Sequence, residues 1–180
     1  MGNIRAATRY ATALLGVAVE RNELDAVAGD VSFLGELIGK VPDFALFLKS
    51  PVVSKERKRK ALKEVLAGKT GNTVMAFVLL LAAKDREALL PPIISEFQRL
   101  RDLKMGILNV SARAASKFSP DQEKRLIDQL ERSTGKKVRL NVGQDRSLVA
   151  GFTVKYEDTV WDASVKRQLE LLGDRLAGRD

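Results

Sequence analysis

Residues 137–172 read KVRLNVGQDRSLVAGFTVKYEDTVWDASVKRQLELL, and this stretch decides the fold class. Apolar and polar residues alternate from Val138 to Val142 and again from Leu148 to Tyr156, which is the period of a strand with one buried face. The turn residues of 143–145 separate the two runs. The sequence therefore predicts a β-hairpin.

The end of the same stretch predicts a helix that packs on the hairpin. Asp162 follows the second strand, and its carboxylate can cap the helix that begins there. Gly151 lies inside the second strand, where a missing side chain usually marks a bulge or a close neighbour. An apolar stripe follows at helical spacing. Its members are Val165, Leu169, Leu172 and Leu176.

The chain before Gly106 is predicted to be helical. Asn22 can cap one helix and Ser54 another, while Gly39 and Pro42 end the helix between them. Residues 73–83 are apolar on all sides, so we expect this helix to be the most buried of the bundle. About six helices fit before Gly106, and they are too short for a coiled coil.

A different pattern begins at Gly106. Residues 107–113 are predicted to be a strand, and Ser119 and Gln122 have the spacing of a capping box before an amphipathic helix. The order from here is strand, helix, strand, strand, helix. The predicted fold is mainly α with a small α+β part: a six-helix bundle domain at 1–105 and an α+β domain at 106–180.

The composition excludes several classes of function. The 180 residues contain no cysteine and no histidine, which removes disulfides, thiolate nucleophiles and Cys/His zinc sites. The longest apolar run, residues 74–83, is about half of the roughly 20 residues that span a membrane. We therefore expect a chain that reaches a membrane only through a partner.

Few residues could carry catalysis. The segment Gly68–Gly71 (GKTG) lacks the earlier glycine and the preceding strand of a phosphate loop. The paired carboxylates Asp85/Glu87 and Glu157/Asp158 lie in predicted turns, where acidic side chains are usually solvated. Asp162 and Ser164 have no histidine beside them in the sequence. We predict no catalytic residue, no cofactor site and no metal site.

Nucleic-acid binding remains the alternative function. The formal net charge is +8, and the excess of basic residues is spread over both halves of the chain. Residues 57–60 (RKRK) are consecutive on a helix and point in different directions, so only part of this run can face one phosphate ligand. No aromatic residue is interleaved with the run, which disfavours a stacking platform for single strands.

The remaining class is a protein–protein adaptor, for which the sequence offers two surfaces. Each is apolar and helical, and each could equally be core. The first surface comprises Ala7, Tyr10, Ala11 and Leu14 beside Val74, Phe77, Val78 and Leu81. The second is the terminal stripe of Val165, Leu169, Leu172 and Leu176.

Three motifs resemble the delta subunit of F-type ATP synthases, the family of the oligomycin-sensitivity-conferring protein. The opening motif comprises Ala7, Tyr10, Ala11, Ala13 and Leu14. A central motif comprises Arg86, Leu89, Pro91, Phe97 and Leu100. The C-terminal signature comprises Lys137, Val138, Leu140, Asp145, Ser147, Leu148, Gly151, Phe152, Val154, Val160, Asp162, Ser164, Val165 and Leu169.

The resemblance implies a stator component and no enzyme. Its helical domain is expected to bind the alpha-subunit N-terminus on the catalytic hexamer, at the first surface. Its C-terminal domain is expected to hold the b-subunit stalk, at the second. Association with the membrane is then expected only through the complex, on the cytoplasmic side of a bacterial inner membrane or on the stromal or matrix side in an organelle.

Overall fold

The structure, a computed structural model, describes residues 2–50, 52–145, 148, 150–156 and 159–169. The chain divides into two units, Met1–Arg101 (unit 1) and Asp102–Asp180 (unit 2), each with its own hydrophobic core. None of the helices described is long and apolar enough to cross a membrane.

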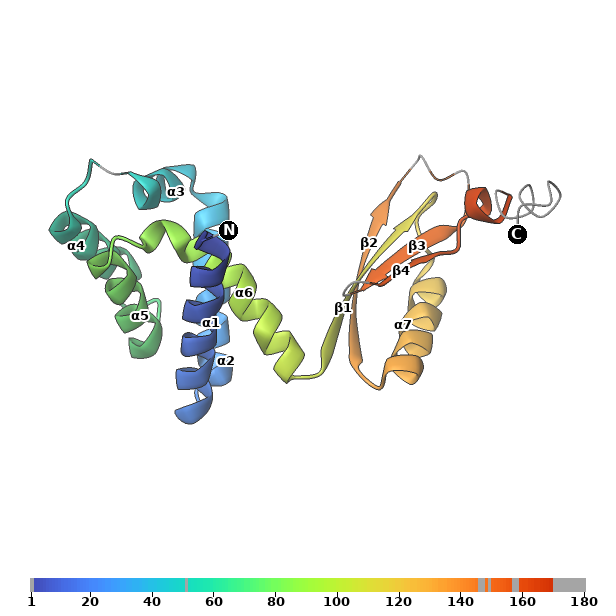
Figure 1. Cartoon of the computed structure of the whole chain (residues 1–180), viewed down its shortest axis with the longest axis horizontal. Coiled ribbons are helices and arrows are strands. Elements are labelled where there is room, and N and C mark those ends of the chain that lie inside the picture. The colour runs from blue at the N-terminus through green and yellow to red at the C-terminus, as the bar shows by residue number, and fades with distance from the viewer. Residues whose placement is uncertain (1, 51, 146–147, 149, 157–158, 170–180) are drawn as a thin grey trace. The chain divides into compact units, whose positions relative to one another are not determined.

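Unit 1 is a helical bundle, as the sequence predicts (Figure 1). Its elements are α1 (Gly2–Glu20), α2 (Leu24–Lys40), α3 (Pro42–Lys49), α4 (Lys55–Leu66), α5 (Asn72–Ala83), the 3-10 helix η1 (Glu87–Leu89) and α6 (Leu90–Lys104), whose end from Asp102 onward belongs to unit 2. Phe97 is the largest fully buried side chain among the described residues, and the core face of α1 is mostly alanine. Alanine has a short side chain, so neighbouring helices can approach the α1 backbone closely.

Helix α5 buries Val74, Val78, Leu81 and Ala82, whereas Leu80 is 48% exposed. Another feature of unit 1 differs from the sequence prediction. Asn22 does not cap α2: its φ of +57° is left-handed, and it closes the C-terminus of α1. The N–H groups of Asn22 and Glu23 donate to the carbonyls of Val19 and Ala18, at 3.0 and 2.8 Å, which is the pattern of a Schellman motif. Glu23 therefore occupies the N-cap position of α2, and its side chain makes no capping hydrogen bond.

A buried ion pair joins α4 to η1. Lys58 Nζ donates to Glu87 Oε1, and the two side chains are only 8% and 3% exposed. The prediction that Glu87 is solvated is therefore wrong, because η1 folds it against α4. Glu87 Oε2 is also buried and has no hydrogen-bond partner among the described residues.

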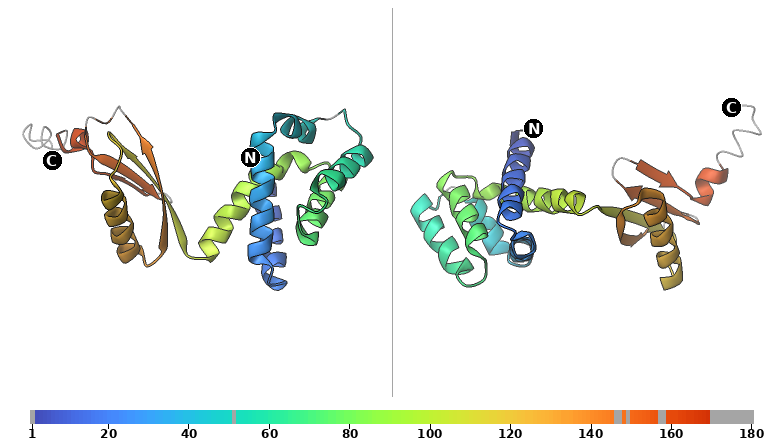
Figure 2. Two further views of the ribbon diagram at one scale, coloured as in Figure 1. Left: turned by 180° about the vertical axis from the view of Figure 1, so that it is seen from behind. Right: turned by 90° about the horizontal axis from the view of Figure 1, so that it is seen from below.

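Unit 2 contains a four-stranded sheet with a helix on one face (Figures 1 and 2). Its elements are β1 (Ile107–Ala114), α7 (Pro120–Thr134), β2 (Lys137–Gln144), β3 (Phe152–Tyr156) and β4 (Thr159–Asp162), and residues 165–169 are helical. Alternate residues of β1 are buried with Leu126 and Leu130 of α7. The capping box of Ser119 and Gln122 starts α7 where the sequence predicts it.

The predicted hairpin of residues 137–156 is wrong. The strand order is β2-β1-β3-β4, so β1 lies between the two strands that the sequence pairs. The β1–α7–β2 segment is a crossover that makes β2 parallel to β1, and β3 then pairs antiparallel with the other edge of β1. The hairpin of unit 2 is β3–β4 instead.

Gly151 has the close neighbour that the sequence predicts. Its φ is +87°, and a Cβ there would overlap the carbonyl oxygen of Ala163 and lie 2.9 Å from the Cα of Ser164. Hydrogen bonds on either side of Gly151 hold residues 150–152 against residues 163–165. The Ala163 N–H donates to the Phe152 carbonyl and the Val165 N–H donates to the Ala150 carbonyl, each at 3.0 Å.

Ser164, and not Asp162, caps the terminal helix. The Arg167 N–H donates to Ser164 Oγ at 3.2 Å, and the Ser164 N–H donates to Asp162 Oδ1 at 2.9 Å. The predicted cap is thus displaced by two residues, because Asp162 still belongs to β4. The pKa of the Asp162 carboxyl is lowered mainly by a hydrogen bond from the Ser164 side chain, and to a smaller extent by one from the Ser164 backbone.

We predict that Gly151→Ala destabilises unit 2 by about 2–4 kcal/mol, because the left-handed backbone and the Ala163 carbonyl both oppose a Cβ. Trp161 is the single tryptophan of the chain, so its fluorescence during urea unfolding reports on unit 2. Gly143→Ala is the control, since a Cβ there meets only an ordinary contact at 3.9 Å. Equal effects of the two substitutions would contradict the close approach at Gly151.

Removing one partner of the Lys58–Glu87 pair should cost about 3–5 kcal/mol, because the other charge stays buried. We therefore expect Lys58→Met and Glu87→Leu each to lower the urea midpoint measured by far-UV circular dichroism, and the double variant to recover most of that loss. The exposed pair Lys55–Asp85 provides the control. Lys55→Met should cost less than about 1 kcal/mol, and additive losses at Lys58 and Glu87 would refute a coupled pair.

Candidate partner-binding surfaces

Six of the eight residues of the first predicted surface lie in the core of unit 1. Each of the six is at most 3% exposed. They are Ala7, Ala11, Leu14, Val74, Val78 and Leu81. Only Tyr10 and Phe77 are partly exposed, and their rings meet edge to face with centroids 6.3 Å apart.

An accessible apolar surface lies beside this core face. On α1, positions 6, 13 and 17 share a side of the helix with Tyr10, and on α5, position 80 shares a side with Phe77. Val17 and Leu80 are exposed, as is Ala13. We call this set the α1–α5 surface; it comprises Ala6, Tyr10, Ala13, Val17, Phe77 and Leu80.

Polar contacts beside this surface show how α1 and α5 run relative to each other. Arg21 Nη1 donates to Thr73 Oγ1 at 3.4 Å, and the Thr73 hydroxyl donates to Glu23 Oε2 at 2.8 Å. Arg86 Nη1 donates to the Tyr10 hydroxyl at 3.1 Å and its guanidinium lies 5.7 Å from the centroid of that ring. The end of α1 therefore lies near the start of α5, which makes the two helices antiparallel.

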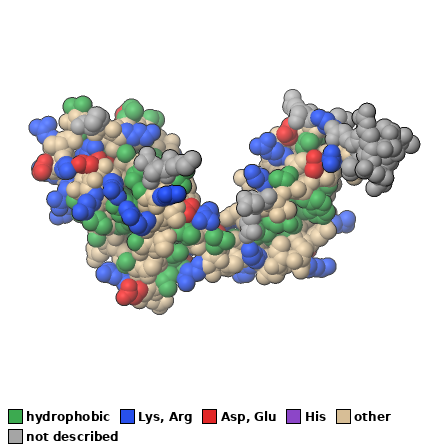
Figure 3. Space-filling view, viewed as in Figure 1, with side chains coloured by type: hydrophobic (Ala, Val, Ile, Leu, Met, Phe, Trp, Pro, Cys, Tyr) green, Lys and Arg blue, Asp and Glu red, His purple; other side chains and the backbone are tan. Residues whose placement is uncertain are grey.

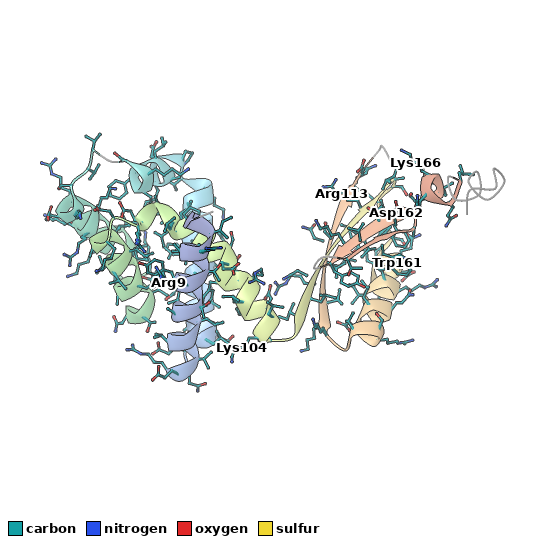
Figure 4. The ribbon with its side chains drawn as sticks, viewed as in Figure 1. Arg9, Lys104, Arg113, Trp161, Asp162 and Lys166 are labelled. Carbon is teal, nitrogen blue, oxygen red and sulfur yellow. The ribbon has the colours of Figure 1, made fainter. Side chains whose placement is uncertain are left out.

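The surroundings of the α1–α5 surface are basic. Figure 3 shows hydrophobic side chains lying among Lys and Arg side chains on the face of unit 1 that carries α1 and α5. Arg9 projects from α1, as Figure 4 shows, and is exposed. A partner that buries this surface would approach through a positive potential.

The second predicted surface is described only in part. Val165 is partly buried and Leu169 is 61% exposed, while Leu172 and Leu176 lie outside the described residues. Two large apolar side chains of β4 were not in the prediction: Val160 is 62% exposed and Trp161 is 47% exposed. These two and Leu169 are the exposed large apolar side chains that the structure describes after Met105.

The segments considered for phosphate binding are engaged in internal contacts. In the loop of residues 68–71, the Gly71 N–H donates to Asp30 Oδ2 at 2.7 Å, so a carboxylate occupies an amide that a phosphate would need. Of the basic run, Lys58 is buried against Glu87, and Arg57, Arg59 and Lys60 are exposed. Among the described residues, no group of three or more His, Cys, Asp or Glu side chains could hold a metal ion.

Comparison with known proteins identifies the family of the chain. Residues 6–176 match the model of the family described as ATP synthase delta (OSCP) subunit. The chain is 40% identical over 179 residues to the ATP synthase subunit delta of Chlorobaculum tepidum, covering 99% of each chain. It is 37% identical over 169 residues to that of Chloroherpeton thalassium, covering 94% of this chain and 92% of the relative.

The fold also matches a chain in the structure of the Toxoplasma gondii mitochondrial ATP synthase hexamer. The TM-score is 0.75 at 23% identity, and the match covers 95% of this chain and 97% of that chain. Because the family model spans most of the sequence and the relatives match over nearly their whole length, the chain belongs to the ATP synthase delta (OSCP) subunit family.

Proposed function

We propose that this chain ties the alpha/beta catalytic hexamer of an F-type ATP synthase to the b-subunit stalk, so that rotary ion transport is coupled to ATP synthesis. As a member of its family, the chain is a peripheral-stalk component of an ATP synthase. The single observation that carries the proposal is the α1–α5 surface, an exposed apolar surface on a unit with its own complete core.

Unit 1 binds the N-terminal helix of an alpha subunit at the α1–α5 surface. An amphipathic helix presents apolar side chains at i, i+3, i+4 and i+7, which suits a strip bounded by two antiparallel helices. Tyr10 and Phe77 provide large side chains in the middle of the strip, and aromatic residues of this kind dominate interface energetics. The core neighbours Ala11 and Val78 support the strip from below.

Unit 2 holds the distal end of the b-subunit stalk. Val160, Trp161 and Leu169 supply its exposed apolar side chains, and Lys166 lies on the helical turn between them. The stalk resists the torque that the rotating shaft applies to the hexamer. Two separately folded units suit that role, because one chain can then bind two different partners.

The chain works as a non-catalytic subunit that reaches the membrane through the complex, on the side where the catalytic hexamer lies. That side is the cytoplasmic face of a bacterial inner membrane, or the equivalent face in an organelle. The engaged Gly71 amide and the buried Lys58 support this over nucleotide or nucleic-acid binding.

We expect Leu80→Glu to weaken binding of a synthetic peptide of the alpha-subunit N-terminal helix by at least tenfold, or about 1.4 kcal/mol. The substitution places a charge on the apolar strip, one helical turn from Phe77, and leaves the core intact because Leu80 is exposed, which circular dichroism melting can verify. Leu46→Glu on α3 is the matched control, because Leu46 is also exposed and lies outside the α1–α5 surface. A peptide that binds the Leu80→Glu variant as tightly as the wild type would place the alpha-subunit site elsewhere.

We also expect the purified chain to bind neither ATP nor ADP at micromolar concentration. The loop of residues 68–71 has no preceding strand, and its Gly71 amide already donates to Asp30. Isothermal titration calorimetry provides the measurement. Stoichiometric heat of binding would contradict a non-catalytic, nucleotide-free role.

A further inference from the structure

We propose that Arg86 and Arg9 select the helix that binds the α1–α5 surface, by pairing with carboxylates that flank the apolar face of that helix. This inference rests on the proposed function, because it states the chemistry by which unit 1 recognises its partner helix at the same surface. It makes the two arginines specificity-determining residues, in addition to the apolar side chains that supply the contact area.

Arg86 is held in a fixed position beside Tyr10, which belongs to the α1–α5 surface. Its Nη1 donates to the Tyr10 hydroxyl at 3.1 Å, and its guanidinium lies 5.7 Å from the centroid of the Tyr10 ring. A guanidinium has five N–H donors, so this one hydrogen bond leaves donors for a carboxylate. Because the Arg86 side chain is already ordered, binding a carboxylate costs little further side-chain entropy.

Arg9 lies beside the same part of the surface. It is exposed and projects from α1, as Figure 4 shows. Ala6 and Ala13 of the α1–α5 surface lie three residues before Arg9 and four residues after it, so the three side chains are neighbours on the helix. Since both alanines are short, a helix that lies on them comes within reach of the Arg9 side chain.

The two carboxylates that flank Arg86 in the sequence are paired with other basic groups. Asp85 pairs with Lys55, and Glu87 pairs with the buried Lys58. Both ion pairs join the segment after α5 to α4 and leave Arg86 without a carboxylate of its own chain among the described residues.

The carboxylate that reaches the Arg9 turn of α1 is also engaged. Glu96 of α6 accepts a hydrogen bond from the Thr8 hydroxyl at 3.3 Å. Its two oxygens accept from Nε and Nη2 of Arg99, at 2.9 and 2.8 Å. In the part of the chain that the structure describes, Arg9 therefore forms no ion pair and is open to a carboxylate of a partner.

The other end of α1 has the opposite balance of charge. Glu20 ends the helix and Glu23 follows it, both are exposed, and Arg21 is the single basic residue between them. Carboxylates on a bound helix are therefore attracted to the part of the surface with Arg9 and Arg86 and repelled from the part with Glu20 and Glu23. This difference determines in which direction the helix lies along the surface.

The test titrates the full chain with a synthetic peptide of the alpha-subunit N-terminal helix from the same ATP synthase. Arg86→Gln should weaken binding by about tenfold or more, because a charge-assisted hydrogen bond is lost. Arg9→Gln, at an exposed position, should weaken it by about two- to fivefold. Arg59→Gln is the matched control: it removes one exposed charge from α4, outside the α1–α5 surface, and should leave binding unchanged. Circular dichroism melting verifies that the variants are folded.

A set of altered peptides separates recognition of a carboxylate from positioning of Tyr10. Each Asp or Glu of the peptide is replaced in turn by Asn or Gln. Once the carboxylate that pairs with Arg86 is replaced, Arg86→Gln should cause no further loss of affinity, as a double-mutant cycle requires. A higher salt concentration should reduce the effect of Arg9→Gln, because that pair is exposed.

Three outcomes count against the inference. Equal affinity of the Arg86→Gln, Arg9→Gln and Arg59→Gln variants would overturn recognition by the arginines and leave the proposed function intact. The same holds for a loss at Arg86 that is equal for every altered peptide, because Arg86 would then act only by positioning Tyr10. A wild-type chain that binds no alpha-subunit peptide would overturn the proposed function together with this inference.

Discussion

Pairing on both edges of β1 is the interaction on which unit 2 depends. β1 is the strand whose alternate residues are buried against α7, and it holds β2 on one side and β3 on the other. Because β1 takes the centre, β2 and β4 become the edges. The two edges of the sheet are thus determined by a strand that itself has no exposed large apolar side chain.

Unit 1 separates core from surface on the same two helices. On α1, the alanines at positions 7, 11 and 18 face inward, and Tyr10 and Val17 lie on the adjacent side. Helix α5 is divided in the same way between Val78 and Leu80. A partner helix can therefore be bound without opening the core, which suits a subunit that must stay folded while it bears load.

Three features could be predicted from the sequence: the helices of unit 1, the capping box at Ser119 and the close backbone approach at Gly151. Each depends on local periodicity or on the backbone freedom of one residue. The strand order could not be predicted, because alternation in residues 137–156 is the same whether the neighbour is the next strand or β1. Register and order depend on α7, whose crossover is a tertiary feature.

The candidate sites could likewise be predicted only where they depend on local sequence. Tyr10 and Phe77 could be found from the apolar pattern. The pattern could not separate them from Ala11 or Val78, which are also apolar but lie in the core. Ala13 and Val17 were not assigned to the first surface because they fall outside the main apolar stripe of α1. Leu80 was not assigned because a helix that is apolar on all sides gives no sign of which side is exposed. The burial of Lys58 could not be predicted either, since its partner Glu87 is 29 positions away.

The Lys58–Glu87 pair also restricts how this chain can change over evolutionary time. A lineage that loses either charge first must pass through an intermediate with an isolated buried ion, whereas losing both charges together leaves an apolar contact. Selection is therefore expected to act on the two positions together, whereas substitution of the exposed Arg57 or Arg59 leaves no buried charge behind.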